Sequence, residues 1–182
     1  QADVFSITRG LASTTLAQVV MDLQNFCRKF MPDTLLTSRL LSEDLYRNMG
    51  LQRMLWEEED QTRLSLQQPA ADIAELSRLN TAGLSVEHVL PQNPAFDIAS
   101  YGFKDAEEFE EHKHRLGNLL LLEKGLNSAC QNATVESKVT VPTLYAASGL
   151  VSVKALAASR VGKPLGYKLE NIEERSQSLA QL

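Results

Sequence analysis

Two short segments of the sequence, residues 84–90 and 116–122, limit the folds that the chain can adopt. Residues 84–90 alternate apolar and polar side chains, which predicts a short β-strand that Pro91 ends. Residues 116–122 form an apolar run that predicts a second strand, begun by a turn at Gly117. Because residues 127–138 are expected to be helical or turn-like, the order of this central part is strand, strand, helix.

The rest of the sequence is typical of helices. Apolar residues recur at helical spacing over residues 12–30, and Pro32 stops that helix. Residues 42–63 are expected to form one or two helices, starting at Ser42 and with Gly50 as a possible break. Further helical segments are expected at residues 105–115, capped by Asp105, and at residues 142–182, with a break around residues 162–166. We therefore predict an α+β fold, mostly helical, with a small ββα finger embedded near its middle. In this scheme residues 1–80 are a helical region that packs on a core of residues 81–182, as one structural unit.

Four polar side chains in the central part suit metal-assisted chemistry. Glu87 and His88 lie at the end of the first predicted strand, Asn118 at the second, and Asn127 nine positions later. A neutral histidine can take a proton from water near neutral pH, and a carboxylate and an amide oxygen are hard ligands that suit Mg²⁺. Strand, strand and helix with these residues describe a ββα metal finger that hydrolyses phosphodiesters, where a cation neutralises charge on the reacting phosphate.

Glu87 and His88 are neighbours on a strand, so their side chains are expected to leave on opposite faces. One of the two must twist locally if both are to serve one site. Pro91 follows shortly afterwards, which is consistent with an irregular strand end at this place.

Three stretches, Val86–Gln92, His114–Leu122 and Leu126–Ser128, closely resemble the C-terminal HNH domain of the GmrSD family. The members of that family are modification-dependent restriction and phage-defence proteins. Residues 171–179 also look like the closing helix of the family, and residues 51–58 resemble its upstream helix. The combined pattern is specific, whereas any one of its pieces alone would be weak.

The resemblance implies that the core of residues 81–182 is an HNH nuclease core. It also implies roles for the polar residues of the central part. The HNH core of the RNA-guided DNA nucleases has a similar acid-His-x-x-Pro-Gln segment and two asparagines nine apart. By that similarity His88 is the general base, and Glu87 and Asn127 hold Mg²⁺, or Mn²⁺ in its place. Asn118 joins His88 in the catalytic set, because it would tie the loop of the finger together and hold His88. Asn127 could instead be only a helix cap.

His114, Arg115 and Lys138 are the expected contacts to nucleic acid. His114 lies in the resembling segment, where phosphate contact and packing are equally reasonable. Lys138 opens a run of five basic residues without an acid, whereas the net charge of the whole chain is −5. Such a run could follow a phosphate backbone, or it could be a solvated surface. The run consists of Lys138, Lys154, Arg160, Lys163 and Lys168.

The resulting hypothesis is a metal-dependent DNA endonuclease domain that nicks DNA or cuts both strands. The resemblance implies a larger protein, whose usual N-terminal part is a ParB-like nucleotide-hydrolysing domain. The start at Gln1 without a methionine also leads us to expect a fragment of a longer protein. Two alternatives remain open. The finger could be a non-catalytic module for DNA binding or subunit docking, which the acidic net charge allows, or the chain could be an RNase of the same fold.

The composition indicates the cellular compartment of the protein and whether it associates with a membrane. No apolar run approaches the roughly 20 residues that a membrane-spanning helix needs, so we expect no membrane partner. Cys27 and Cys130 are too few for a disulfide framework or a cysteine-based zinc site, and they suit a reducing cytosol. We therefore expect a cytoplasmic protein.

Overall fold

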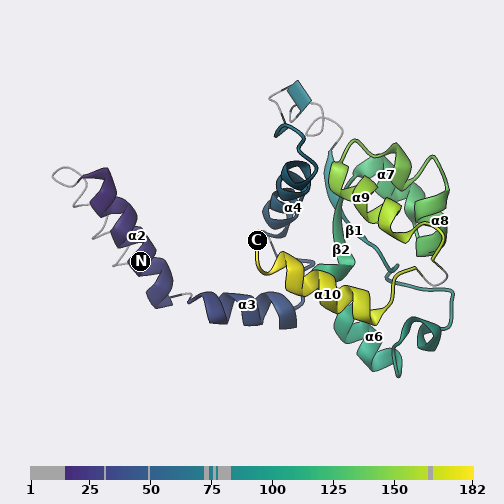
Figure 1. The fold of residues 1–182 in the computed structure, drawn as a ribbon. Coiled ribbons are helices and arrows are strands. Elements are labelled where there is room, and N and C mark those ends of the chain that lie inside the picture. The colour runs from purple at the N-terminus through teal and green to yellow at the C-terminus, as the bar shows by residue number, and fades with distance from the viewer. Residues whose placement is uncertain are drawn as a thin grey trace. The chain divides into compact units, whose positions relative to one another are not determined.

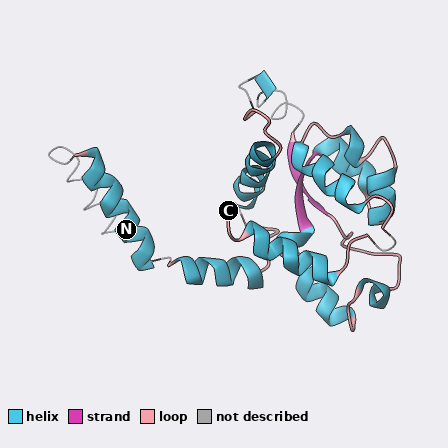
Figure 2. Ribbon diagram, in the orientation of Figure 1, coloured by secondary structure: helices cyan, strands magenta, loops and turns pink. Residues whose placement is uncertain are grey.

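The computed structural model of the protein describes residues 15–30, 32–48, 50–71, 74–75, 77, 83–163 and 166–182. Contacts between residues divide the chain into two compact units, Gln1–Arg39 and Leu40–Leu182. Figure 1 shows the elements along the chain, and Figure 2 shows their types. In the described part helices predominate beside a two-stranded sheet, as predicted for an α+β fold. Within these ranges no helix is both long and apolar enough to cross a membrane.

The first unit contains helix α2 (Leu16–Phe30), where apolar residues recur at helical spacing as the sequence predicts. The first predicted residues of this helix, 12–14, lie outside the described ranges. Pro32 separates α2 from α3 (Asp33–Ser42), and the first amides of α3 donate to the Pro32 carbonyl. Proline fits there because a first helical turn does not need its missing N–H group. The expectation that Ser42 starts a helix is wrong, since Ser42 ends α3.

The sheet pairs β1 (Leu84–His88) with β2 (Leu119–Glu123) in antiparallel orientation. Each strand is shorter than the segment that the sequence predicts. The two residues after His88 bend away from the strand, and the second predicted segment begins with the short 3₁₀ helix η3 (Leu116–Asn118). The turn expected at Gly117 is this 3₁₀ helix.

Helix α7 (Lys124–Cys130) follows β2 directly and contacts both strands. Helix α8 (Val135–Thr140) comes next, and the side chain of Thr134 caps it. The predicted helical segment 127–138 therefore consists of parts of two helices. Asn127 lies inside α7, so the alternative that it is only a helix cap is wrong.

The remaining elements are α4 (Leu51–Ser65), η2 (Ile98–Tyr101), α6 (Ala106–His112), η4 (Tyr145–Ala147), α9 (Val151–Arg160) and α10 (Leu169–Leu179). The Asp105 carboxylate caps α6, as predicted, by accepting a hydrogen bond from the Glu108 amide at 2.9 Å. In the tail, the predicted break separates α9 from α10, whereas the helix expected from residue 142 begins only at Val151, and residues 142–150 form turns and η4.

Strand β2 is buried on both of its faces. Residues 119–122 are each at most 2 % exposed, although successive side chains of a strand point to opposite faces. Helices α4, α7 and α9 all contact this strand, and Figure 2 shows the sheet in magenta among them. The end of β1, where Glu87 and His88 lie, is therefore paired with a strand that is held by packing on both faces.

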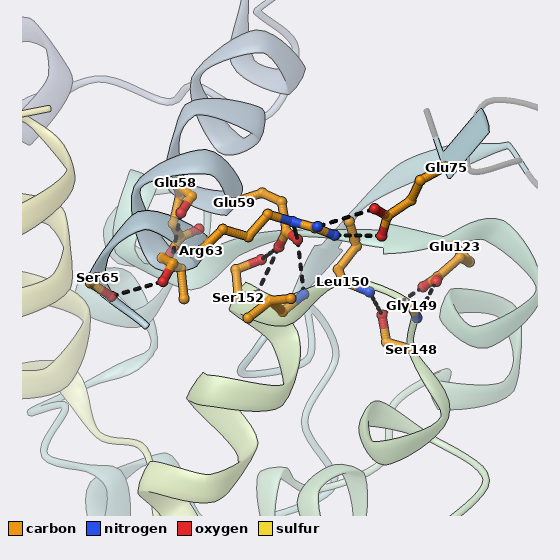
Figure 3. A network of polar contacts seen from close by, with 12 residues as sticks. Glu58, Glu59, Arg63, Ser65, Glu75, Glu123, Ser148, Gly149, Leu150 and Ser152 are labelled. Carbon is orange, nitrogen blue, oxygen red and sulfur yellow. Dashed lines mark hydrogen bonds and ion pairs between the residues drawn. The ribbon is translucent and has the colours of Figure 1, made fainter. Parts of the chain in front are cut away.

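A buried carboxylate joins α4 to the start of α9. Glu59 is fully buried and accepts hydrogen bonds from the Val151 amide at 2.9 Å and from the Ser152 amide and hydroxyl at 2.8 and 2.7 Å. Arg63 donates to the same carboxylate at 2.7 Å and to Glu75 at 2.6 and 3.1 Å (Figure 3). Burial alone would raise the pKa of Glu59, but the hydrogen bonds from Ser152 and its other donors lower it below its ordinary value. The Glu59 carboxylate therefore satisfies amides at the N-terminus of α9 from a distant part of the chain.

Helix α10 packs against η3 at close range. The Gly117 amide donates to the Ser176 hydroxyl at 2.8 Å, and Arg175 donates to the Gly117 carbonyl at 2.7 Å. A Cβ atom on Gly117 would overlap the Ile172 carbonyl oxygen. This close approach therefore requires a glycine, and α10 in turn holds the start of β2.

Candidate functional site

A small pocket with a volume of about 170 Å³ lies at the end of β1, and we call it the His88 pocket. Its lining includes Glu87 and His88 from β1, Gln92 and Asn93 from the following loop, Asn127 from α7, and Tyr46. Three of the residues to which the sequence assigns chemistry, Glu87, His88 and Asn127, thus share one pocket although they come from two elements.

The Glu87 carboxylate is buried and paired with a lysine. Glu87 is 4 % exposed, and its Oε1 atom lies 2.7 Å from Nζ of Lys138. The Tyr145 hydroxyl donates to the same oxygen at 3.4 Å. Burial raises the pKa of Glu87 above its ordinary value, while the charge of Lys138 acts in the opposite direction. The carboxylate is thus held next to a cation that the protein itself supplies.

The structure corrects the expectation that Lys138 contacts phosphate, because the Lys138 side chain is fully buried. Besides the ion pair with Glu87, its ammonium group donates to the His88 carbonyl at 2.6 Å and to the Val89 carbonyl at 3.1 Å. A buried ammonium group is tolerated when its donors are paired, and these three contacts use them all. Lys138 therefore fastens the end of β1 where the chain bends. At this bend Glu87 and His88 both line the pocket, despite being neighbours on a strand.

His88 is held by two aromatic neighbours. Its Nε2 atom lies 2.9 Å from Nδ1 of His114, and the Tyr46 ring centroid lies 4.5 Å from that of His88. Burial, followed by electrostatic repulsion of the protonated ring by His114, Lys138 and Lys113, lowers the pKa of His88 to about 3. The imidazole is therefore neutral near neutral pH and has a lone pair that can accept a proton.

The Asn118 side chain holds two backbone segments together, the loop after His88 and the residue before His114. Its Oδ1 atom accepts from the Leu90 amide at 2.7 Å, and its Nδ2 atom donates to the Leu90 carbonyl at 3.1 Å and the Lys113 carbonyl at 2.8 Å. The residue is fully buried, so it cannot touch a substrate. Its place in the catalytic set is therefore corrected to that of a positioning residue, which ties the loop after His88 as the resemblance implies.

Asn127 crosses from α7 to β1. Its Nδ2 atom donates to the Ser85 hydroxyl at 2.9 Å and to the Val86 carbonyl at 3.0 Å. These contacts use the amide nitrogen and fix the rotation of the side chain. The amide oxygen is not needed for them, so it is the atom that could serve as a ligand in the pocket.

The donor set of the His88 pocket fits magnesium. Glu87 offers a carboxylate and Asn127 an amide oxygen, and both are hard ligands. No group of three or more His, Cys, Asp or Glu side chains in the described residues could hold a metal ion. A closed site made of protein ligands alone is thus not seen in this part of the chain. Magnesium needs no such site, since it keeps several waters and shares its coordination with substrate phosphates.

The two other predicted contacts to nucleic acid lie outside the lining of the His88 pocket. His114 is half-buried and lies behind His88. The Arg115 guanidinium donates to the Glu111 carbonyl at 3.0 Å and the Leu41 carbonyl at 2.9 Å, beside a different cavity next to α10. Both side chains are therefore already engaged within the protein. Of the predicted basic run, Lys154 and Lys163 are exposed, whereas Arg160 lies over the Tyr167 ring.

Tyr46 belongs to the site, although no motif in the sequence marks it. Its ring stacks on His114 with centroids 5.0 Å apart and an interplanar angle of 10°. Tyr145, which donates to Glu87, carries no motif either. The one general rule that applies to Tyr145, which is fully buried, is that a buried tyrosine hydroxyl usually needs a polar partner.

The family model described as GmrSD restriction endonucleases, C-terminal domain, matches residues 33–182. No curated protein and no solved structure matches the chain. The matched range begins with α3 and includes all the residues named above for the His88 pocket.

Proposed function

The chain belongs to the family of C-terminal domains of the GmrSD restriction endonucleases, which implies a nuclease role of that type, and we propose that β1, β2 and α7 form the HNH finger of a metal-dependent DNA endonuclease. The observation that carries this proposal is the meeting of Glu87, His88 and Asn127 in one pocket. A carboxylate, a neutral imidazole and an amide on a strand–strand–helix unit are the groups that the proposed hydrolysis needs.

His88 is the general base of the proposed reaction. Its neutral imidazole accepts a proton from water, whose O–H bond breaks while the electron pair stays on the oxygen. That oxygen attacks the phosphorus, and the bond from phosphorus to the leaving oxygen breaks. The leaving oxygen takes a proton from solvent, and the protonated His88 then gives its proton back to solvent, so that one phosphodiester and one water become a phosphate monoester and an alcohol.

Glu87 and Asn127 are the residues that would hold Mg²⁺, or Mn²⁺ in its place. When bound, the cation supplies positive charge that neutralises the phosphate during the reaction. Lys138 and Asn118 act without touching the substrate, because both are buried. Lys138 holds the Glu87 carboxylate, and Asn118 holds the loop after His88.

DNA is the proposed substrate, nicked or cut on both strands, and the proposed setting is restriction or phage defence in the cytoplasm. A ParB-like nucleotide-hydrolysing domain is the proposed N-terminal partner and would control cleavage. Lys154 and Lys163 are candidates for contacts to the DNA backbone, because both are exposed cations of the basic run.

A plasmid assay tests the proposed function. We expect the protein to convert supercoiled plasmid DNA to the nicked or linear form with Mg²⁺, and to stop when the metal is chelated. His88→Ala should lower the rate by about 10²–10⁴-fold, because the general base is lost, while an uncleavable duplex still binds. Asn127→Ala should raise the Mg²⁺ concentration needed for half-maximal rate. His112→Ala is the matched control, since His112 does not line the His88 pocket, and should cleave like the wild type.

Three outcomes would decide against parts of this proposal. Wild-type cleavage by a folded His88→Ala protein contradicts the assignment of the base. DNA binding without cleavage at any Mg²⁺ or Mn²⁺ concentration favours the non-catalytic module. Parallel digestion of RNA and DNA that degrades only RNA favours an RNase.

A further inference from the structure

Within the described residues, the imidazole ring of His88 makes one polar contact, and its partner is His114. His88 Nε2 and His114 Nδ1 lie 2.9 Å apart, which is a hydrogen bond that needs one proton and one lone pair. His88 lines the pocket and His114 does not, so Nε2 is turned toward the protein. The atom of His88 left to meet a water molecule is therefore Nδ1.

This geometry allows only one arrangement of protons in which His88 can act as a base. If His114 donated from Nδ1, the neutral His88 ring would carry its proton on Nδ1, and no lone pair would face the pocket. If His88 donates from Nε2, the lone pair of its Nδ1 atom is available. His114 must then be the acceptor at Nδ1 and carry its own proton on Nε2.

We propose that His114 is a positioning residue, whose Nδ1 atom accepts a hydrogen bond from His88 Nε2 and so keeps His88 in the tautomer with an unprotonated Nδ1. This inference rests on the proposed role of His88 as general base. When His88 takes a proton from water at Nδ1, the Nε2–H bond stays in place, and the His114 lone pair stabilises the imidazolium. No proton needs to leave the pair during this step.

His114 is itself held in place from three sides. Its carbonyl accepts from the Leu45 amide at 3.2 Å, next to Tyr46 in the chain. The preceding carbonyl, of Lys113, accepts from Asn118 Nδ2 at 2.8 Å, the same amide that fixes the loop after His88. The Tyr46 ring stacks on the His114 ring. Asn118 therefore holds the backbone next to His114 and the loop after His88 together, as expected if His114 orients His88.

Two amide substitutions separate this role from a structural one. In His114→Asn an amide oxygen can take the place of Nδ1 and accept from His88. In His114→Gln the longer side chain places its amide near the former Nε2, away from His88. We expect His114→Gln and His114→Ala to lower kcat by about tenfold to a hundredfold through misorientation of the base, and His114→Asn to lose least. The Kd for an uncleavable duplex should be the same in all three.

The tautomer can be measured without any cleavage. The chain has three histidines, so ¹⁵N-histidine NMR spectra of the metal-free protein can be assigned with His88→Ala and His112→Ala. We expect the His88 Nε2–H tautomer in the wild type and in His114→Asn, and a mixture of tautomers in His114→Gln.

The outcomes distinguish this inference from the proposed function. A wild-type His88 protonated on Nδ1 overturns the inference even if the protein cleaves DNA. Equal losses of duplex affinity in His114→Asn and His114→Gln with unchanged kcat would make His114 a phosphate contact instead. If His88→Ala cleaves normally, the proposed base is wrong, whereas the NMR spectra still show whether His114 sets the tautomer.

Discussion

The ammonium group of Lys138 meets three acceptors, the carboxylate of Glu87 and the carbonyls of His88 and Val89. A cation buried without such partners would be strongly unfavourable. The partners depend on it equally, because without Lys138 a carboxylate would be buried with no cation nearby, and two carbonyl oxygens would lose a donor. The Lys138 side chain therefore contributes both to the stability of the protein and to the geometry of the His88 pocket.

We predict that Lys138→Met lowers the free energy of unfolding by about 3–5 kcal/mol, the usual loss when one partner of a buried ion pair is removed. The double variant Lys138→Met with Glu87→Gln should lose less than the sum of the two single variants, because no unpaired charge remains. Urea unfolding at neutral pH measures this coupling. Lys154→Met, at an exposed position of α9, is the control and should change stability by less than about 0.5 kcal/mol. Strict additivity in the double variant would show that the pair is not coupled.

At the scale of elements, the contact between α10 and η3 decides how β2 begins. Gly117 lies so close to α10 that a methyl group would meet the Ile172 carbonyl and the Ser176 hydroxyl. Backbone atoms cannot move aside as the end of a flexible side chain can, so a larger residue must displace α10 or η3. Asn118, which follows directly, would move with η3 and loosen the loop after His88.

Gly117→Ala is therefore predicted to destabilise the protein by about 1–3 kcal/mol, as overpacking does, and to lower cleavage more than DNA binding. Gly125→Ala provides a matched comparison, because Gly125 lies in α7 and, apart from its chain neighbours and the backbone of its own helix, no described atom lies within 4 Å of an added Cβ. That substitution should raise stability by about 0.5–1 kcal/mol, since alanine favours helix more than glycine does. Thermal unfolding of both variants checks the prediction, and a Gly117→Ala protein as stable as the wild type would contradict the close approach.

At the scale of the whole molecule, Glu59 connects segments that are far apart in the sequence. Its carboxylate lies on α4 and accepts from the amides of Val151 and Ser152 at the start of α9. Both helices also contact β2. The charge of one buried carboxylate thus contributes to the assembly of the core around the strand that supports the site.

The lowered pKa of Glu59 predicts how stability depends on pH. A carboxyl group whose pKa is lower in the folded than in the unfolded state adds stability that is fully present above its unfolded pKa, about 4.3. That stability is lost as the pH falls through the lower, folded pKa. The difference in unfolding free energy between the wild type and Glu59→Gln should therefore be largest near pH 7 and should shrink below about pH 4.

Chemical unfolding at a series of pH values tests this expectation. Glu57→Gln, two positions earlier on α4 and only half-buried, is the control and should show a smaller difference from the wild type at neutral pH. A difference for Glu59→Gln that stays constant between pH 7 and pH 3 would mean that the charge of Glu59 does not hold α9.

The sequence alone determined the order of the central elements and the residues worth testing there. Alternating and continuous apolar segments predict two strands because local periodicity records which faces are buried. Glu87, His88 and Asn127 can be singled out because their spacing along the chain matches that order. The sequence pattern does not indicate α3, and it indicates the start of α7 too late, at residue 127, because neither element begins with a strong local signal.

Only the tertiary structure decided which side chains meet. Lysine is nearly always exposed, so the sequence favours a surface role for Lys138, and its burial follows only from the acceptors that the fold brings to it. The same holds for Tyr46 and His114, which reach His88 through contacts that local patterns do not encode. Periodicity reports whether a position is buried, whereas the identity of its partner depends on how distant segments pack.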